Sequence, residues 1–142
     1  MTFMTVEAFL DTNILAYAVS GAPEDAAKRK VAEKLIESVD FGISGQVLQE
    51  FYNTVTRKFS VPLTHDEAID WLLMFEELPV VPVDASLVYH GAETAQRYKL
   101  SYWDGAIVAA AQRLQTQTLF TEDLNHGQSY GSVRAVNPFH PN

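Results

Sequence analysis

The segment Val6-Glu7-Ala8-Phe9-Leu10-Asp11-Thr12-Asn13 decides the fold class. Its first five residues are mostly apolar, as in a short buried strand, and the run stops at three polar residues that favour a turn. Ligands of parallel α/β sheets bind at the carboxyl ends of the strands, which is where Asp11 falls. The segment therefore predicts a strand over 6–10 that leads into a functional loop.

Predicted helices and strands alternate along the rest of the chain. The spacing of apolar residues and helix-start signals indicate helices over 14–19, 23–39, 46–59, 64–75, 85–99 and 103–114. Short apolar runs indicate strands over 41–44, 79–83, 118–121 and 133–136, and the prolines of the second run favour strand ends or a sheet edge. This alternation favours parallel β-α units. We expect a three-layer α/β/α fold around a central, mostly parallel sheet of about five strands.

Composition and charge exclude several classes of protein. The length of 142 residues fits a single domain over residues 1–142. The chain has no cysteine, which excludes a disulfide scaffold, a thiolate zinc site and a cysteine nucleophile. No apolar run approaches the roughly 18 residues of a membrane span and no signal peptide is visible, so we expect a cytoplasmic protein without membrane contact. The net charge of −8 argues against a nucleic-acid binder unless the acids gather at a metal site.

Four acidic residues lie after predicted strands or near the start of predicted helices: Asp11, Glu50, Asp104 and Asp123. Strand ends and helix starts meet at one edge of a parallel sheet, so we expect the four side chains to converge on one cleft. Carboxylates that close repel one another unless a cation neutralises them, which predicts a metal site. A set of oxygen ligands without Cys or paired His suits Mg²⁺ or Mn²⁺ better than Zn²⁺.

Each of these acids also has a purely structural interpretation. Asp11 can cap the following helix, and Asp104 fits an S-x-x-D cap. Glu50 can be a solvated helix acid, and Asp123 can be a turn residue. The adjacent Glu122 competes with Asp123 for the fourth position in the site. Only the joint placement of the acids after successive strands favours a shared function.

Four motifs contain these acids. They are Phe9-Leu10-Asp11-Thr12-Asn13-Ile14-Leu15, Ser44-Gly45-Gln46-Val47-Leu48-Gln49-Glu50-Phe51, Ser101-Tyr102-Trp103-Asp104-Gly105-Ala106-Ile107 and Leu119-Phe120-Thr121-Glu122-Asp123. Their order and separations resemble those of the PIN-domain family, in particular the VapC-type toxin ribonucleases. The resemblance spans the whole chain.

The resemblance implies a hydrolase, an Mg²⁺- or Mn²⁺-dependent endoribonuclease that cuts RNA phosphodiester bonds. The residues that match the family's catalytic and metal-ligating positions are Asp11, Glu50, Asp104 and Asp123. The residues that match supporting positions are Thr12, Asn13, Ser101 and Thr121. The resemblance also implies a toxin of a toxin–antitoxin system, with a cognate antitoxin protein as partner, and a homodimer.

Basic and aromatic residues near the predicted cleft have less specific roles. The candidates for contact with RNA phosphates are Arg57, Lys58, Arg97 and Lys99. The run Lys28-Arg29-Lys30 is interpreted as a solvated helix face rather than an RNA groove. Four aromatic or apolar residues belong either to the core or to a dimerisation patch: Tyr52, Trp71, Leu72 and Phe75.

Two other functions remain open from the sequence. A haloacid-dehalogenase-like phosphatase also begins with a strand that ends in Asp, but such enzymes need a second Asp two residues later, where this chain has Asn13. A non-catalytic RNA-binding module on the same PIN fold is the second alternative. It would be favoured by the loss of one of the four acids, and none is lost.

Overall fold

A sheet forms the middle layer of the computed structural model, which describes residues 6–141. Its strands are β1 (Ala8–Leu10), β2 (Phe41–Ser44), β3 (Val80–Val81), β4 (Thr118–Phe120), β5 (Ser129–Tyr130) and β6 (Val133–Val136). The helices are α1 (Thr12–Val19), α2 (Ala26–Ser38), α3 (Gly45–Asn53), α4 (His65–Phe75), α5 (Ala85–Tyr98) and α6 (Tyr102–Arg113). Two short turns, η1 (Pro23–Asp25) and η2 (Thr54–Lys58), precede α2 and follow α3.

The sheet is mostly parallel, as the alternating pattern predicted. Within the described residues the strand order is β3-β2-β1-β4-β6-β5, and every neighbouring pair is parallel except β5 and β6. The five parallel strands are those expected from the sequence, and β3 lies at the edge that its flanking prolines favoured. The two-residue antiparallel strand β5 was not predicted.

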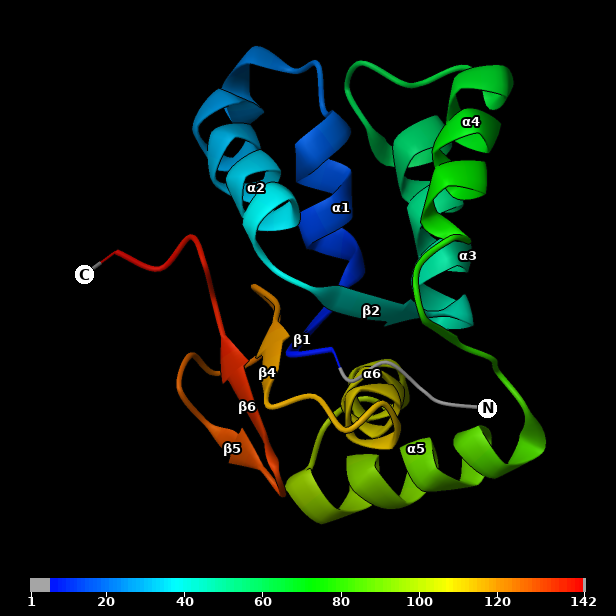
Figure 1. Ribbon diagram of the computed structural model, residues 1–142, viewed down its shortest axis with the longest axis vertical. Helices are drawn as coiled ribbons and strands as arrows, with labels where there is room; N and C mark the ends of the chain where they lie inside the picture. The colour runs from blue at the N-terminus through cyan, green and yellow to red at the C-terminus, as the bar shows by residue number, and fades with distance from the viewer. Residues whose placement is uncertain (1–5, 142) are drawn as a thin grey trace.

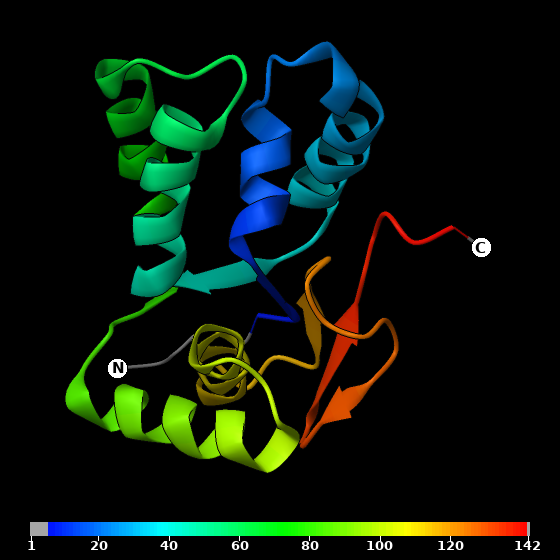
Figure 2. The same cartoon turned by 180° about the vertical axis from the view of Figure 1, so that it is seen from behind.

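Helices cover the sheet from two sides, which confirms the three-layer α/β/α class. The hairpins α1–α2 and α3–α4 stand on one side, and α5 and α6 pack together on the other (Figure 1). The reverse view shows the same division (Figure 2). No helix in residues 6–141 has the length and hydropathy needed to cross a membrane.

The core lies where the central strands meet these helices. Phe9 and Leu10 of β1, Ile43 of β2 and Leu119 of β4 are fully buried, together with Ile14 of α1. Burying an apolar side chain of this size stabilises the fold by roughly 1.5–3 kcal/mol. The carboxyl ends of β1, β2 and β4 are therefore held rigidly, and this fixes the positions of the polar residues that follow them.

Polar N-caps start a helix directly after β1 and after β2, on the side of the site. Asp11 is the N-cap of α1, and its side chain accepts a hydrogen bond from the Thr12 N–H. Ser44 caps α3 by accepting from the Val47 N–H. These caps satisfy backbone donors that a helix leaves unpaired.

Two details of the helices differ from the prediction. The helix expected over 46–59 ends at Asn53 and continues as the π-helical turn η2. The Thr56 hydroxyl donates to the Tyr52 carbonyl at 2.6 Å and so competes with regular helix bonding. In addition, α5 ends one residue early, because Lys99 adopts the left-handed conformation with φ 57°.

The four residues that the sequence assigned either to the core or to a dimerisation patch pack inward. Phe75 belongs to the core, and Tyr52, Trp71 and Leu72 pack against it. The exposed apolar side chains of α4 are instead Leu73 and Met74.

Candidate active site

A cleft of about 810 Å³ lies between α1 and α3, beside the carboxyl ends of the central strands. Six of the predicted acidic and supporting residues, with the rival Glu122 counted among them, line it: Asp11, Thr12, Asn13, Glu50, Glu122 and Asp123. They come from three distant parts of the sequence. The fold thus brings the first, second and fourth motifs to one cleft, as their placement after β1, β2 and β4 predicted.

Asp11 lies at the bottom of the cleft and is buried, with 4% of its surface exposed. One carboxylate oxygen accepts from the Thr12 N–H at 2.7 Å, and the other accepts from the Thr121 hydroxyl at 2.8 Å. Burial raises the pKa of Asp11 to about 7, even though both hydrogen bonds lower it. The charges of Asp123 and Glu50 raise the pKa further, so the three acids interact.

Glu50 faces Asp11 from α3. Its Oε1 accepts from the Thr12 hydroxyl at 3.1 Å, so Thr12 contacts both acids through its N–H and its side chain. Partial burial raises the pKa of Glu50, and the charges of Asp123 and Asp104 add to that effect. Glu50 is therefore part of the acidic cluster rather than a freely solvated helix residue.

Asp123 is held in the turn after β4. Its Oδ2 accepts from the Asn13 side-chain amide at 3.1 Å, and its N–H donates to the Thr121 hydroxyl at 3.1 Å. Half-burial raises the pKa of this acid, as does the charge of Asp104. Asn13 and Thr121 thus connect the fourth motif to the first.

Asp104 lies at the rim, in the first turn of α6. It is not among the described residues that line the cleft, although its neighbour Trp103 is. The Ser101 hydroxyl accepts from the Asp104 N–H at 3.1 Å, which places Ser101 as the N-cap of α6. Because the Asp104 charge raises the pKa of Glu50 and Asp123, it belongs to the same electrostatic cluster.

The acids surround the cleft but do not meet at one point. Within residues 6–141, no three Asp, Glu or His side chains are arranged closely enough to form a ready metal site. The donor set itself consists of carboxylate, hydroxyl and amide oxygens, which are the ligands that Mg²⁺ and Mn²⁺ prefer.

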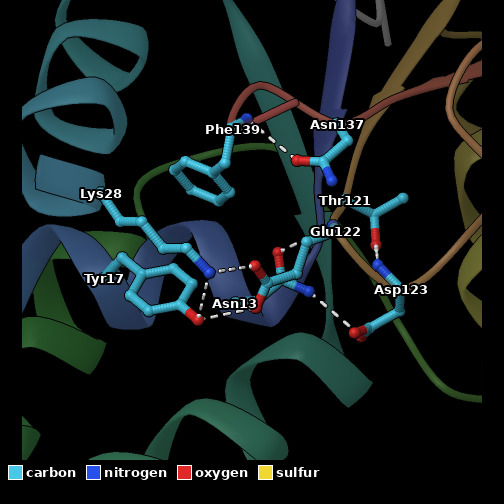
Figure 3. Close-up of polar contacts among 8 residues, drawn as sticks. All are labelled: Asn13, Tyr17, Lys28, Thr121, Glu122, Asp123, Asn137 and Phe139. Atoms are coloured by element: carbon cyan, nitrogen blue, oxygen red, sulfur yellow. Dashed lines mark hydrogen bonds and ion pairs between the residues drawn. The ribbon is translucent and has the colours of Figure 1, made fainter. Parts of the chain in front are cut away.

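The geometry separates the two adjacent acids of the fourth motif. Both oxygens of Glu122 are engaged away from the other acids: Oε1 accepts from the Tyr17 hydroxyl at 2.7 Å, and Oε2 pairs with Lys28 at 2.8 Å. The Asp123 carboxylate points instead to Asn13 (Figure 3). This arrangement favours Asp123 as the fourth acid of the cluster.

The predicted RNA-contact residues are dispersed. Lys58 lines the cleft, at the end of η2. Arg97 lines a separate cavity on α5, and among the described lining residues of the cleft neither Arg57 nor Lys99 is present.

Several side chains at the site were not identified from the sequence. Lys28 was interpreted as part of a solvated face, yet it bonds to Tyr17 and Glu122. Gln46 donates to the Trp103 carbonyl at 3.1 Å and so links α3 to α6. The position of Gln46 on the same helix face as Glu50 was a usable signal, whereas nothing local pairs Lys28 with a residue 94 positions away.

The fold and the acidic cleft together define an α/β protein with a carboxylate site at the carboxyl ends of a parallel sheet. The sequence matches the PIN domain over residues 8–129. The chain belongs to the PIN-domain family, so the dehalogenase-like alternative is not supported. No curated protein matches the sequence.

Solved structures with the same fold include toxins and their complexes. A toxin–antitoxin complex from Klebsiella pneumoniae aligns with a TM-score of 0.69 at 19% identity, over 95% of this chain and 100% of that chain. The Mycobacterium tuberculosis toxin VapC20, described as cleaving the sarcin-ricin loop, aligns with a TM-score of 0.67 at 20% identity, over 90% and 99%. FitAB bound to a DNA fragment aligns with a TM-score of 0.62 at 20% identity, over 95% and 97%. At these identities the likeness establishes the fold.

Proposed function

We propose that the chain is a divalent-metal-dependent endoribonuclease of the VapC type, the toxin of a toxin–antitoxin pair. The observation that carries this proposal is the cluster of Asp11, Glu50, Asp104 and Asp123 around one cleft. Burial raises the pKa values of Asp11, Glu50 and Asp123, and the charges of neighbouring acids raise them further. Acids that repel one another at the end of a sheet cost stability, and a bound cation would remove that cost.

The residues present fit Mg²⁺ or Mn²⁺. Asp11, Glu50 and Asp123 would hold the ion from the cleft, and Asp104 would complete the set from the rim, directly or through water. Side-chain rotations would have to bring these groups together, because in the described residues they do not converge on one point. When bound, the cation supplies positive charge that stabilises the oxygens of a phosphodiester and activates water for hydrolysis.

The protein groups have separable tasks in this proposal. Thr12 and Thr121 fix the two oxygens of Asp11, and Asn13 orients Asp123. Glu50 and Asp123 line the cleft, so either of them would be placed to accept a proton from a water molecule there.

The cleft also offers contacts for single-stranded RNA. Lys58 provides a positive charge for a phosphate. Trp103 lines the same cleft with 63% of its surface exposed, and an exposed aromatic ring can stack on an unpaired base. Together they favour an unpaired RNA strand, as in a loop, over a duplex.

The decisive experiment measures cleavage of end-labelled RNA that contains a single-stranded loop. We expect cleavage by the wild-type chain with Mg²⁺ or Mn²⁺, none with EDTA, and none by Asp104→Asn. The matched control is Asp70→Asn, which removes an exposed acid of α4 and should cut normally.

Two outcomes would contradict the proposal. Equal cleavage by Asp104→Asn and the wild type would remove Asp104 from the site. RNA binding without any metal-dependent cleavage would instead support the non-catalytic RNA-binding module.

The proposed partners follow from the relatives. Structures with this fold include a toxin–antitoxin complex and FitAB bound to DNA. We propose that this chain likewise pairs with a cognate antitoxin. On the family resemblance alone, we also propose that it forms a homodimer and acts on RNA in the cytoplasm. Light scattering of the chain alone, and co-purification with the product of a neighbouring reading frame, test the dimer and the antitoxin separately.

A further inference from the structure

We propose that Lys28, Tyr17 and Phe139 form a clamp that fixes Glu122 and thereby positions Asp123 toward the other acids. These are positioning residues, since none of them belongs to the acidic cluster. The inference deepens the proposed function, because it concerns how the fourth acid of that site is held.

Glu122 is the centre of the clamp. The Lys28 ammonium lies 2.8 Å from one of its oxygens, and the Tyr17 hydroxyl donates to the other at 2.7 Å. Lys28 also donates to the Tyr17 hydroxyl at 3.2 Å, so the three groups close a ring of polar contacts (Figure 3). An ion pair and a second charge-assisted hydrogen bond together leave Glu122 little freedom to rotate.

Phe139 closes the clamp from the C-terminal segment. Its ring meets the Tyr17 ring edge-on at 5.2 Å, and the Lys28 ammonium lies 5.3 Å from its centroid. The Asn137 side chain accepts from the Phe139 N–H at 2.9 Å and fixes the approach of this segment (Figure 3). Phe139 lies beyond residues 8–129, the part of the chain that matches the family.

The clamp reaches Asp123 through one peptide bond and one amide side chain. The Glu122 N–H points to Asn13 Oδ1 at 3.4 Å, and the amide nitrogen of Asn13 donates to Asp123 Oδ2 at 3.1 Å. Fixing Glu122 therefore fixes the turn that carries Asp123. Outer partners of this kind orient metal ligands, and their loss typically weakens metal binding by roughly 10–100-fold.

The test uses two variants with different electrostatic consequences. Lys28→Met removes the cation but keeps much of the side-chain length, whereas Phe139→Ala changes no charge. Lys28→Arg restores the charge and serves as the rescue. The matched controls are Lys30→Met on the same helix and Tyr89→Ala, both at exposed positions.

Two readouts are needed, and neither is RNA cleavage. Amide hydrogen exchange at Glu122 and Asp123, measured by NMR without metal, reports the rigidity of the turn. Calorimetric titration with MnCl₂ reports the affinity of the site. We expect faster exchange at these two amides and at least tenfold weaker Mn²⁺ binding for Lys28→Met and Phe139→Ala, with wild-type behaviour for both controls and partial recovery for Lys28→Arg.

The results separate the clamp from the proposed function. Unchanged exchange and unchanged Mn²⁺ affinity in Phe139→Ala and Lys28→Met overturn the clamp, while wild-type Mn²⁺ binding still supports the metal site. If only Lys28→Met weakens Mn²⁺ binding, the effect is one of charge and positioning is refuted. If the wild type binds no Mn²⁺, the proposed metal site fails, and the exchange measurement alone decides whether the clamp holds the turn.

Discussion

Asp11 combines structural and chemical roles in one carboxylate. Its oxygens accept from the Thr12 N–H and the Thr121 hydroxyl, and burial raises its pKa to about 7. The folded chain therefore keeps a proton on Asp11 at pH values where the unfolded chain, with a pKa near 3.8, has released it. Between these two values the folded state binds more protons, so the free energy of unfolding falls as pH rises.

This sign gives a first prediction for the metal-free protein. In EDTA, the contribution of Asp11 should make the unfolding free energy of the wild type lower at pH 8 than at pH 5, by on the order of a few kcal/mol at most. Urea denaturation at the two pH values measures this difference as a lower midpoint at pH 8. Asp11→Asn should flatten this pH dependence. Other acids titrate in both chains, so the difference between the two profiles isolates Asp11, and parallel profiles would refute the raised pKa.

Thr121 provides a second prediction at the scale of one residue. Its hydroxyl donates to Asp11 and accepts from the Asp123 N–H, so one oxygen joins two proposed ligands. Thr121→Val keeps the shape and removes this link, and should weaken Mn²⁺ binding by roughly 10–100-fold. Thr121→Ser should recover most of the affinity in calorimetric titration. A valine variant with wild-type affinity would show that the hydroxyl is dispensable.

The helices α5 and α6 pack closely against each other near the site. A Cβ on Gly105 would lie 2.7 Å from the Ala95 nitrogen and from the Gly91 carbonyl oxygen, both on the backbone of α5. Gly105 directly follows Asp104, so the same close contact fixes the helix that carries the rim acid.

Gly105→Ala is therefore expected to destabilise the fold although alanine favours helices. Overpacking of this kind typically costs about 1–3 kcal/mol, measured by urea denaturation. The matched control is Gly21→Ala, where the nearest atom would lie 3.9 Å from the added Cβ and stability should change little. Equal stability of both variants would mean that α5 and α6 can separate freely.

The elements were largely predictable because their signals are local. The strand predicted over 6–10, which forms as Ala8–Leu10, the helix start at Thr64 and the Ser101 cap each depend on residues close in sequence, and the structure contains all three. The π-helical turn η2 and the two-residue strand β5 were missed. Strand β5 has only two residues, too few for an alternating pattern, and is defined by its hairpin pairing with Val133 and Arg134 of β6. In η2 the Phe59 N–H donates to the Thr54 carbonyl, a change of bonding that the spacing of apolar residues does not report.

The arrangement of the site was predictable in part for the same reason. The order of strands places Asp11, Glu50 and Asp123 at one cleft, which follows from the rule for parallel sheets. The orientation of Glu122 was not predictable, because it depends on Lys28 and on Phe139, which contact one another only after the whole chain has folded.

At the scale of the whole molecule, the net charge of −8 predicts a response to divalent cations. An ion that binds the folded acidic cluster and not the unfolded chain stabilises the fold by about 2.7 kcal/mol at 100 times its Kd. Mn²⁺ should therefore raise the Tm of the wild type and of Asp70→Asn, and raise that of Asp104→Asn much less. The same rise in all three proteins would indicate nonspecific binding to the acidic surface.

Asp11 both caps α1 and belongs to the proposed metal site, and this affects how the activity of diverged homologues can be inferred from their sequences. An acid or amide at this position still caps α1 after the chemistry has been lost, so helix stability alone can preserve it. Asp104 has a weaker structural reason to persist, because the Ser101 hydroxyl already caps α6. In a comparison of homologous sequences, the residue at the position of Asp104 should therefore distinguish active nucleases from inactive homologues better than the residue at the position of Asp11.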